Sequence, residues 1–250
     1  MKKLIAFDQD DTINITKMPI DGEMAELLSQ LMEKFQVCII SGTDWEVMKR
    51  NDIDTLPANA NLTNYIIMPT TGTQYWYFEN GDWKREYAHF LTEEQSEKVS
   101  ESLEKAAKSL GYWPDFPEGE VIENRGSQIT YSGLGQWAKP EEKHAWDPDM
   151  KKRQKILALI EEELKELGVK MGIGGATSID VTLPNIDKAY GIRELMKITG
   201  LKKEEILFIG DMLDEGGNDY PVKAFGIDTI QVRNCEDTKW ILRGILAISY

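Results

Sequence analysis

The sequence LIAFDQDDT at residues 4–12 decides the fold. Its first four residues are apolar, as in a parallel-sheet strand that helices cover on both faces. The stretch then ends in three carboxylates and a hydroxyl, and ligands of open α/β sheets bind beyond the carboxyl ends of such strands. Asp8 and Asp10 repel each other unless a divalent cation neutralises them, and either one can attack phosphorus. The alternative is a strand followed by an aspartate-stabilised turn.

Three later segments favour an active site over an isolated turn. VCIISGTD at residues 37–44 is an apolar strand that places Ser41 to bond a phosphoryl oxygen. ILFIGD at residues 206–211 ends in Asp211, and the acidic, glycine-rich loop that follows is suited to binding a hard cation through oxygen. Lys188 opens a helix, where the helix dipole does not stabilise a cation, so it needs an anionic partner.

The order of the other segments predicts an α/β fold with two parts. Apolar strands alternate with helices up to residue 68, which predicts a Rossmann-like parallel-sheet core. An aromatic hairpin turns at residues 79–82, and helices expected near residues 92–111 and 149–167 are interleaved with short strands that we expect to be antiparallel. We therefore predict a catalytic core at residues 1–84 and 186–250 and an inserted α+β cap domain at residues 85–185.

Composition limits the kinds of partner that the chain can have. Its 29 Lys+Arg and 43 Asp+Glu give a net charge of −14, which argues against nucleic acid or an anionic membrane surface. Cys38 and Cys235 are expected to be reduced thiols, and no apolar run approaches the ~20 residues of a membrane span. We expect a soluble, cytoplasmic protein that binds a small molecule. Trp137 and Trp146 are expected in the core of the cap, and the oligomeric state stays open.

Four ordered motifs carry a family resemblance. An Asp-x-Asp-x-Thr strand end, a serine at a second strand end, a lysine that opens a helix and a Gly-Asp strand end resemble the haloacid dehalogenase-like phosphotransferases. Three longer blocks, at residues 174–188, 210–220 and 235–238, are similar to eukaryotic-type phosphomannomutases and related sugar-phosphate phosphatases. The resemblance implies Mg²⁺-dependent phosphoryl transfer through an aspartyl-phosphate, with a phosphorylated sugar as substrate.

The resemblance also implies roles for individual residues. Asp8 would be the nucleophile, Asp10 the general acid and base, and Ser41 and Lys188 would bind phosphoryl oxygens. The Mg²⁺ ligands would be Asp8, the main-chain carbonyl of Asp10, and Asp211, with Asn218 or Asp219 completing or orienting the shell. The substrate-binding set would be Gly42, Thr43, Arg125, Ser178 and Asp180.

Departures from the mutase pattern favour hydrolysis. The chain has Asp11 and Ser41 where those mutases usually have glycine. Lys17, Gln136 and Lys143 stand where arginines that hold the second phosphate of a sugar bisphosphate would be expected. Lysine binds phosphate only as a point charge, whereas arginine binds it through two parallel hydrogen bonds. We therefore predict a sugar-phosphate phosphatase, with interconversion of mannose-1-phosphate and mannose-6-phosphate as the alternative and an inactive sugar-phosphate-binding protein as a remote one.

Overall fold

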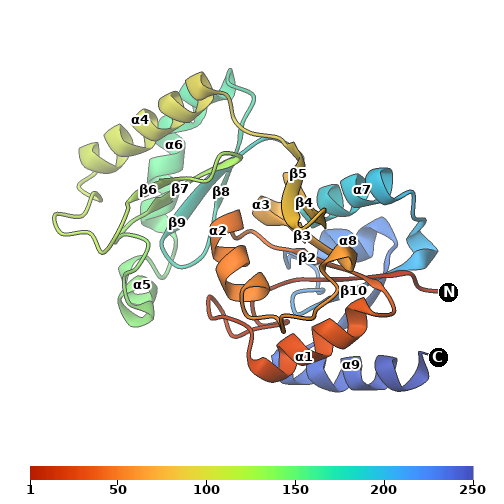
Figure 1. Ribbon diagram of the computed structural model, residues 1–250. Coiled ribbons are helices and arrows are strands. Elements are labelled where there is room, and N and C mark those ends of the chain that lie inside the picture. Colours follow the sequence, from red (N-terminus) through yellow and green to blue (C-terminus); the bar gives the residue numbers. More distant parts are fainter. Residues whose placement is uncertain (250) are drawn as a thin grey trace. The chain divides into compact units, whose positions relative to one another are not determined.

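The structure is a computed structural model that describes residues 1–249 and divides into two compact units (Figure 1). The core unit comprises Met1–Ala88 and the chain from Ile186 onward, and the cap unit comprises His89–Asn185. In the described chain, no helix is both long enough and apolar enough to cross a membrane. The α/β class with a parallel-sheet core is confirmed.

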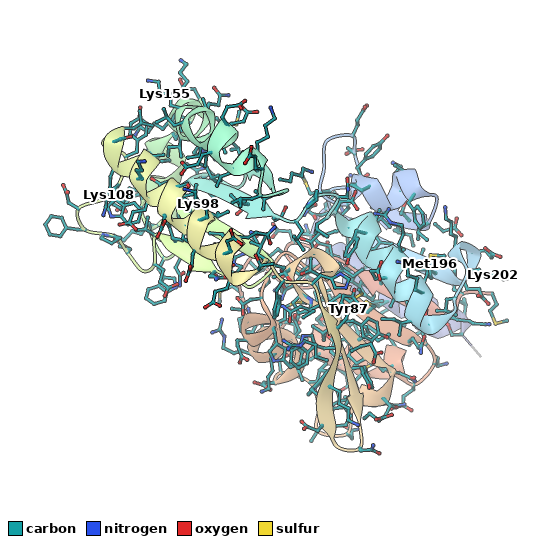
Figure 2. The ribbon with its side chains drawn as sticks, turned by 90° about the horizontal axis from the view of Figure 1, so that it is seen from above. Tyr87, Lys98, Lys108, Lys155, Met196 and Lys202 are labelled. Carbon is teal, nitrogen blue, oxygen red and sulfur yellow. The ribbon has the colours of Figure 1, made fainter. Side chains whose placement is uncertain are left out.

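The core unit is built on a mixed sheet, with strands in the order β11-β10-β1-β2-β3-β4-β5 (Figure 1). The strands from β11 to β3 are parallel, and the β4–β5 hairpin adds an antiparallel edge to the same sheet. Their bounds are β1 (Leu4–Phe7), β2 (Gln36–Ile40), β3 (Tyr65–Met68), β4 (Gln74–Glu79), β5 (Asp82–Ala88), β10 (Ile206–Gly210) and β11 (Asp228–Gln231). The hairpin is thus part of the core, and Tyr87 near its end donates its hydroxyl to the carbonyl of Gly72 at 2.6 Å (Figure 2).

Helices cover both faces of this sheet, which explains why its central strands are apolar throughout. One face packs against α1 (Gly22–Met32) and α9 (Cys235–Ile248), and the other against α7 (Lys188–Thr199) and α8 (Tyr220–Phe225) (Figure 1). The short α2 (Trp45–Met48) and α3 (Pro69–Gly72) follow β2 and β3. Helix α2 is followed directly by a π-helical turn, Lys49–Ile53.

The cap unit is an antiparallel sheet, in the order β6-β7-β9-β8, with helices on one face. Its elements are α4 (Glu93–Ser109), β6 (Ile122–Asn124), β7 (Gln128–Ser132), α5 (Pro140–Trp146), α6 (Lys151–Lys165), β8 (Lys170–Ile173) and β9 (Ser178–Thr182). Alternate strand residues such as Tyr131 and Ile179 are buried with the apolar side chains of α4 and α6. Figure 2 shows Lys98 and Lys108 along α4 and Lys155 on the neighbouring α6.

Local sequence signals in the cap have mixed outcomes. The helix expected near residues 92–111 is α4, and Thr92 and Gln95 form a capping box at its start. The helix expected from Asp149 begins at Lys151, because Met150 is left-handed with φ of 60°. The placement of Trp137 in the cap core is wrong, since its side chain is 74% exposed, whereas Trp146 packs against the core.

Candidate active site

Three carboxylates gather at the carboxyl ends of two neighbouring strands. Strands β1 and β10 are parallel and pair Phe7 with Ile209, so Asp8 and Asp211 leave the sheet side by side. Asp219 returns to the same place from the loop after β10. One ligand atom from each of these aspartates lies within 4.8 Å of the others, an all-oxygen set that fits a hard divalent cation such as Mg²⁺.

Lys188 at the start of α7 supplies the positive charge of this cluster. Its side chain is almost fully buried, and its Nζ donates to Asp8 Oδ1 and, at 2.6 Å, to Asp219 Oδ1. Burial by itself lowers the pKa of Lys188, but the two carboxylates outweigh burial and raise it above its ordinary value. The lysine is therefore charged and has the anionic partners that its sequence position required.

The cluster has more negative than positive charge. Lys188 offsets only one of the three carboxylates. Burial raises the pKa of Asp8, and burial together with the charge of Asp219 raises the pKa of Asp211. A divalent cation stabilises crowded carboxylates of this kind. It would also balance the negative charge that Lys188 leaves.

The loop after β1 orients the side chain of Asp10. Asp10 Oδ1 accepts a hydrogen bond from the main-chain N–H of Lys17 at 2.8 Å. Asp11 has a φ of 58°, in the left-handed region where glycine is favoured and aspartate is among the better-tolerated residues. Its carboxylate accepts hydrogen bonds from the Thr16 N–H at 3.3 Å and hydroxyl at 2.7 Å. Asp11 thus adopts a left-handed turn conformation of the kind that glycine favours.

The loop after β2 carries Ser41, Gly42 and Thr43. Ser41 is 4% exposed, and its Oγ accepts from the N–H of Thr43 at 3.1 Å. The N–H of Thr71 donates to the carbonyl of Ser41 at 2.7 Å. Thr70 and Thr71 are both left-handed, with φ of 48° and 61°, which is strained for β-branched residues. Our sequence analysis missed this support, although the glycine of PTTG at residues 69–72 signals a turn.

The cap places a second polar cluster on one row of its sheet. Glu123, Thr130 and Asp180 are neighbours in register on β6, β7 and β9. Asp180 Oδ1 accepts from the Thr130 hydroxyl at 2.8 Å and from Gln128 Nε2 at 3.0 Å. Burial raises the pKa of Asp180 against these hydrogen bonds and the charge of Arg125.

Arg125 already has a carboxylate partner. Its Nε and Nη2 donate to the two oxygens of Glu123 at 2.8 and 2.9 Å, a fork-to-carboxylate pair. Ser178 begins β9 and pairs with Ser132 in register. The structure therefore gathers Arg125 and Asp180 in one cap cluster with Glu123, Gln128 and Thr130, which our sequence analysis did not include.

The side chains at the three positions that depart from the mutase pattern differ in their surroundings. Lys143 Nζ donates to the carbonyl of Gln136 at 2.7 Å. The buried Oε1 of Gln136 has no hydrogen-bond partner in the described part of the chain. Lys17 is exposed and left-handed, with φ of 64°. On the loop after β10, Asn218 is also exposed, and its contact with a metal stays a prediction.

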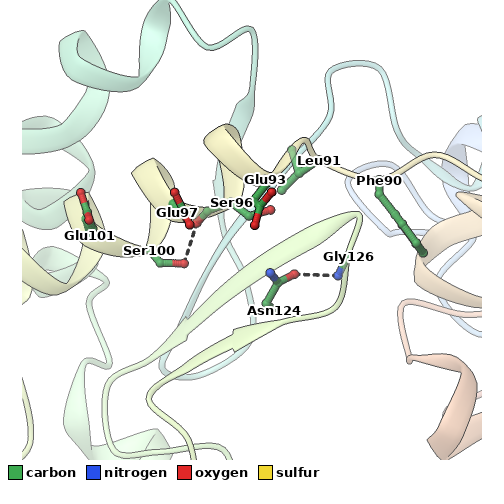
Figure 3. A pocket seen from close by; sticks show the side chains of 9 residues that line it. All are labelled: Phe90, Leu91, Glu93, Ser96, Glu97, Ser100, Glu101, Asn124 and Gly126. Carbon is green, nitrogen blue, oxygen red and sulfur yellow. Dashed lines mark hydrogen bonds between the residues drawn. The ribbon is translucent and has the colours of Figure 1, made fainter.

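A groove of about 780 Å³ lies within the cap unit, between the first turns of α4 and the β6–β7 turn (Figure 3). Glu93, Glu97 and Glu101 line it at four-residue intervals, together with Phe90 and Gly126. These carboxylates disfavour an anionic ligand, so we do not place a sugar phosphate there.

Comparison with known proteins identifies the family to which the chain belongs. The model of the eukaryotic phosphomannomutase family matches residues 24–248. The chain belongs to this family. A phosphomannomutase of Encephalitozoon cuniculi is 28% identical over 251 residues, which cover 95% of this chain and 91% of that relative. A phosphomannomutase of Saccharomyces cerevisiae is 26% identical over 88% of this chain and 84% of that relative.

Solved structures of the haloacid dehalogenase-like superfamily share the fold. The IMP-nucleotidase of Plasmodium falciparum superposes with a TM-score of 0.70 at 19% identity, over 99% of this chain and 63% of that chain. A haloacid dehalogenase-like hydrolase from Bacteroides thetaiotaomicron superposes with a TM-score of 0.66 at 16% identity, over 98% of this chain and 100% of that chain. At these identities the likeness concerns the fold alone.

Proposed function

We propose that this member of the phosphomannomutase family is a Mg²⁺-dependent phosphatase that hydrolyses a sugar phosphate through an aspartyl-phosphate. The observation that carries the proposal is the buried cluster of Asp8, Lys188 and Asp219 beside Asp211. Phosphoryl transfer depends on positioning and on neutralising the charge of the moving group, and this cluster has the groups for both.

Asp8, Asp211 and the main-chain carbonyl of Asp10 would hold Mg²⁺, which when bound supplies positive charge next to the transferred phosphoryl group. Both oxygens of Asp219 are engaged, one by Lys188 and the other by the N–H of Met212 at 3.1 Å. We therefore assign Asp219 the role of orienting Lys188, and leave Asn218 as the candidate further ligand.

The residues of this chain can carry both chemical steps. In the first, Asp8 attacks phosphorus, the bond from phosphorus to the sugar oxygen breaks, and Asp10 gives its proton to that oxygen. In the second, water attacks the aspartyl-phosphate, its proton goes to Asp10, and Asp8 leaves as a carboxylate. Lys188, Ser41, Gly42 and Thr43 would bind the phosphoryl oxygens.

Arg125, Ser178 and Asp180 are the proposed substrate contacts of the cap. Hydrolysis is favoured over isomerisation because a mutase must hold a bisphosphate by its second phosphate while the sugar turns around. Arg125 is engaged by Glu123, Lys143 is engaged by a carbonyl, and Gln136 carries no charge. Phosphomannomutase activity is the second candidate, since the curated relatives carry that name.

The test is a panel assay with the full chain and Mg²⁺. Phosphate release is measured from hexose 1- and 6-phosphates, beside conversion of mannose-1-phosphate to mannose-6-phosphate with a bisphosphate activator. We expect release from a hexose phosphate to exceed isomerisation. Faster isomerisation than release would replace the phosphatase with the mutase, and no turnover in either assay would favour a binding protein.

A further inference from the structure

Two buried polar residues lie on the π-helical turn Lys49–Ile53 behind the catalytic loop of the core unit. Asn51 is 1% exposed and Asp52 is 0% exposed. Single π-helical turns are rare and occur often at functional sites. Asn51 and Asp52, which we call the brace, both contact the loop that follows β1.

Asn51 connects the brace to the segment that holds Asp10. Its Nδ2 donates to the carbonyl of Lys17 at 3.3 Å, and its own carbonyl accepts from the N–H of Ile20 at 3.0 Å. Lys17 in turn donates its N–H to Asp10 Oδ1 at 2.8 Å. A continuous chain of hydrogen bonds thus runs from Asn51 to the carboxylate of Asp10.

Asp52 contacts the residue between the two catalytic aspartates. Gln9 is 1% exposed, and its Nε2 donates to Asp52 Oδ2 at 2.7 Å. Gln9 lies between Asp8 and Asp10 in the loop after β1, and its carbonyl accepts from the N–H of Ile13 at 2.9 Å, so a side-chain contact at Gln9 restrains the backbone that carries both aspartates. The brace therefore contacts the loop after β1 at three residues, Gln9, Lys17 and Ile20.

Burying Asp52 is costly to the fold. Asp52 Oδ1 and Gln9 Oε1 have no hydrogen-bond partner among residues 1–249. Burial, with a smaller contribution from the charge of Asp10, raises the pKa of Asp52 to about 7. An apolar pair at these positions would avoid both costs. The Gln9–Asp52 pair lowers stability relative to an apolar pair, which points to a role that apolar packing does not fill.

We infer that Asn51 and Asp52 are positioning residues that hold Asp10 in the orientation required for proton transfer, an inference that rests on the proposed phosphatase function. Hydrogen bonds fix direction as well as distance, whereas apolar contacts leave the loop freer to turn. A displacement of about 1 Å of a catalytic group can cost on the order of 100-fold in rate.

The main test compares Asp52→Leu, Asp52→Asn and the double variant Gln9→Leu/Asp52→Leu. Asp52→Asn keeps an acceptor for Gln9, so its kcat should stay within about threefold of wild type. Asp52→Leu should lower kcat by about ten- to a hundredfold with KM nearly unchanged. The double variant leaves no orphaned polar group and should regain Tm but not kcat. Recovery of kcat in the double variant would show that the pair acts only through stability.

Leu242→Ala is the matched control. Leu242 is fully buried on α9 in the same unit and takes no part in the loop. This variant should lower Tm at least as much as Asp52→Leu and keep the wild-type kcat below its melting range. A comparable loss of kcat in Leu242→Ala would mean that destabilisation alone explains the Asp52 effect, and the brace would be rejected.

A second readout identifies the group that the brace positions. Nitrophenolate leaves without a proton, so its burst from p-nitrophenyl phosphate reports the attack by Asp8 without the acid step of Asp10. Asp52→Leu should preserve the burst rate while the rate of sugar-phosphate cleavage falls. Equal losses in both rates would overturn the assignment to Asp10.

Failure of the brace can be separated from failure of the proposed function. If the wild-type chain releases no phosphate from any substrate, the phosphatase proposal fails whatever the variants do. Hydrogen exchange then tests the brace without turnover, because Asn51→Leu removes the bond to the Lys17 carbonyl, and the Lys17 amide that bonds Asp10 should exchange faster in this variant than in wild type or Asp52→Asn. Unchanged exchange would overturn the brace independently of activity.

Discussion

The two units treat their buried carboxylates differently. In the cap unit, buried Asp147 pairs with the guanidinium of Arg153 at 2.8 Å and part-buried Glu123 pairs with Arg125, whereas Asp180, whose pKa burial raises, accepts hydrogen bonds from Thr130 and Gln128. In the core unit, Asp8, Asp211 and Asp219 have only Lys188 between them, and Asp52 forms no ion pair in the part of the chain that the structure describes.

The difference distinguishes a carboxylate that an arginine neutralises from a cluster of carboxylates that is short of positive charge. Burial tends to raise the pKa of Asp147, but the hydrogen bonds from Arg153 and the backbone outweigh it and lower the pKa. The carboxylates of the core cluster have raised pKa values and lack a second cation. The core cluster therefore favours binding of an added cation, while in the cap Arg125 is engaged by Glu123 and Lys143 by the carbonyl of Gln136.

The largest expected effect is at the proposed nucleophile. Asp8→Asn keeps the shape of the side chain but removes the nucleophilic carboxylate, so phosphate release should fall by on the order of 10³-fold or more. The measurement is kcat on the best sugar phosphate, with circular dichroism to show that the fold is intact. Asp228→Asn, on the exposed β11, should retain full activity. Release by Asp8→Asn within tenfold of wild type would remove Asp8 from the mechanism.

The second prediction concerns the metal and contrasts the two units directly. Chelation should stop phosphate release and added Mg²⁺ should restore it, and Asp211→Ala should bind Mg²⁺ far more weakly than wild type in calorimetry. Asp180→Asn in the cap should leave Mg²⁺ binding unchanged and raise KM. If Asp211→Ala binds Mg²⁺ as tightly as wild type, the set of ligands is wrong.

The third prediction uses the opposite pKa shifts of Asp52 and Asp147. A carboxyl whose pKa is about 7 in the folded state and 3.8 when unfolded binds more protons folded than unfolded between these values. Its contribution to stability therefore falls as pH rises through this window. Asp52→Asn should remove about 2–3 kcal/mol of pH dependence in the free energy of unfolding between pH 5 and 7.5.

Asp147→Asn serves as the control in the same urea-denaturation series. The pKa of Asp147 is lowered, so its stabilisation is present above the unfolded pKa and is lost only in more acidic solution. Between pH 5 and 7.5 the difference in the free energy of unfolding between Asp147→Asn and wild type should be constant. A constant difference for Asp52→Asn as well would contradict the raised pKa of Asp52.

The smallest expected effect concerns the shortage of positive charge in the cap. Gln136→Arg combined with Lys143→Arg should restore paired contacts to a second phosphate and shift the ratio of isomerisation to hydrolysis by about tenfold toward isomerisation. Glu123→Gln, which removes the partner carboxylate of Arg125, should shift it in the same direction. An unchanged ratio in both variants would mean that another feature controls the choice between hydrolysis and isomerisation.

Much of the core could be predicted because its signals are local. The apolar run at residues 4–7 forms β1, and the run from Ile206 forms β10 as far as Gly210, since apolar runs that end in glycine or aspartate mark buried parallel strands. It was harder to predict from the sequence that the β4–β5 hairpin belongs to the core sheet. A hairpin can form by itself, and its pairing with β3 depends on which edge of the sheet is available.

The sequence by itself determined which residues leave the strand ends, because strand periodicity and helix starts are properties of neighbouring residues. It thereby indicated Asp8, Asp10, Ser41, Lys188 and Asp211 as the residues to examine. Only the tertiary structure decided that Gln9 contacts Asp52, 43 residues away, and that Asp180 accepts from Thr130 across the cap sheet. Such contacts join segments whose separation in the chain carries no signal, so they exist only once the fold has brought the segments together.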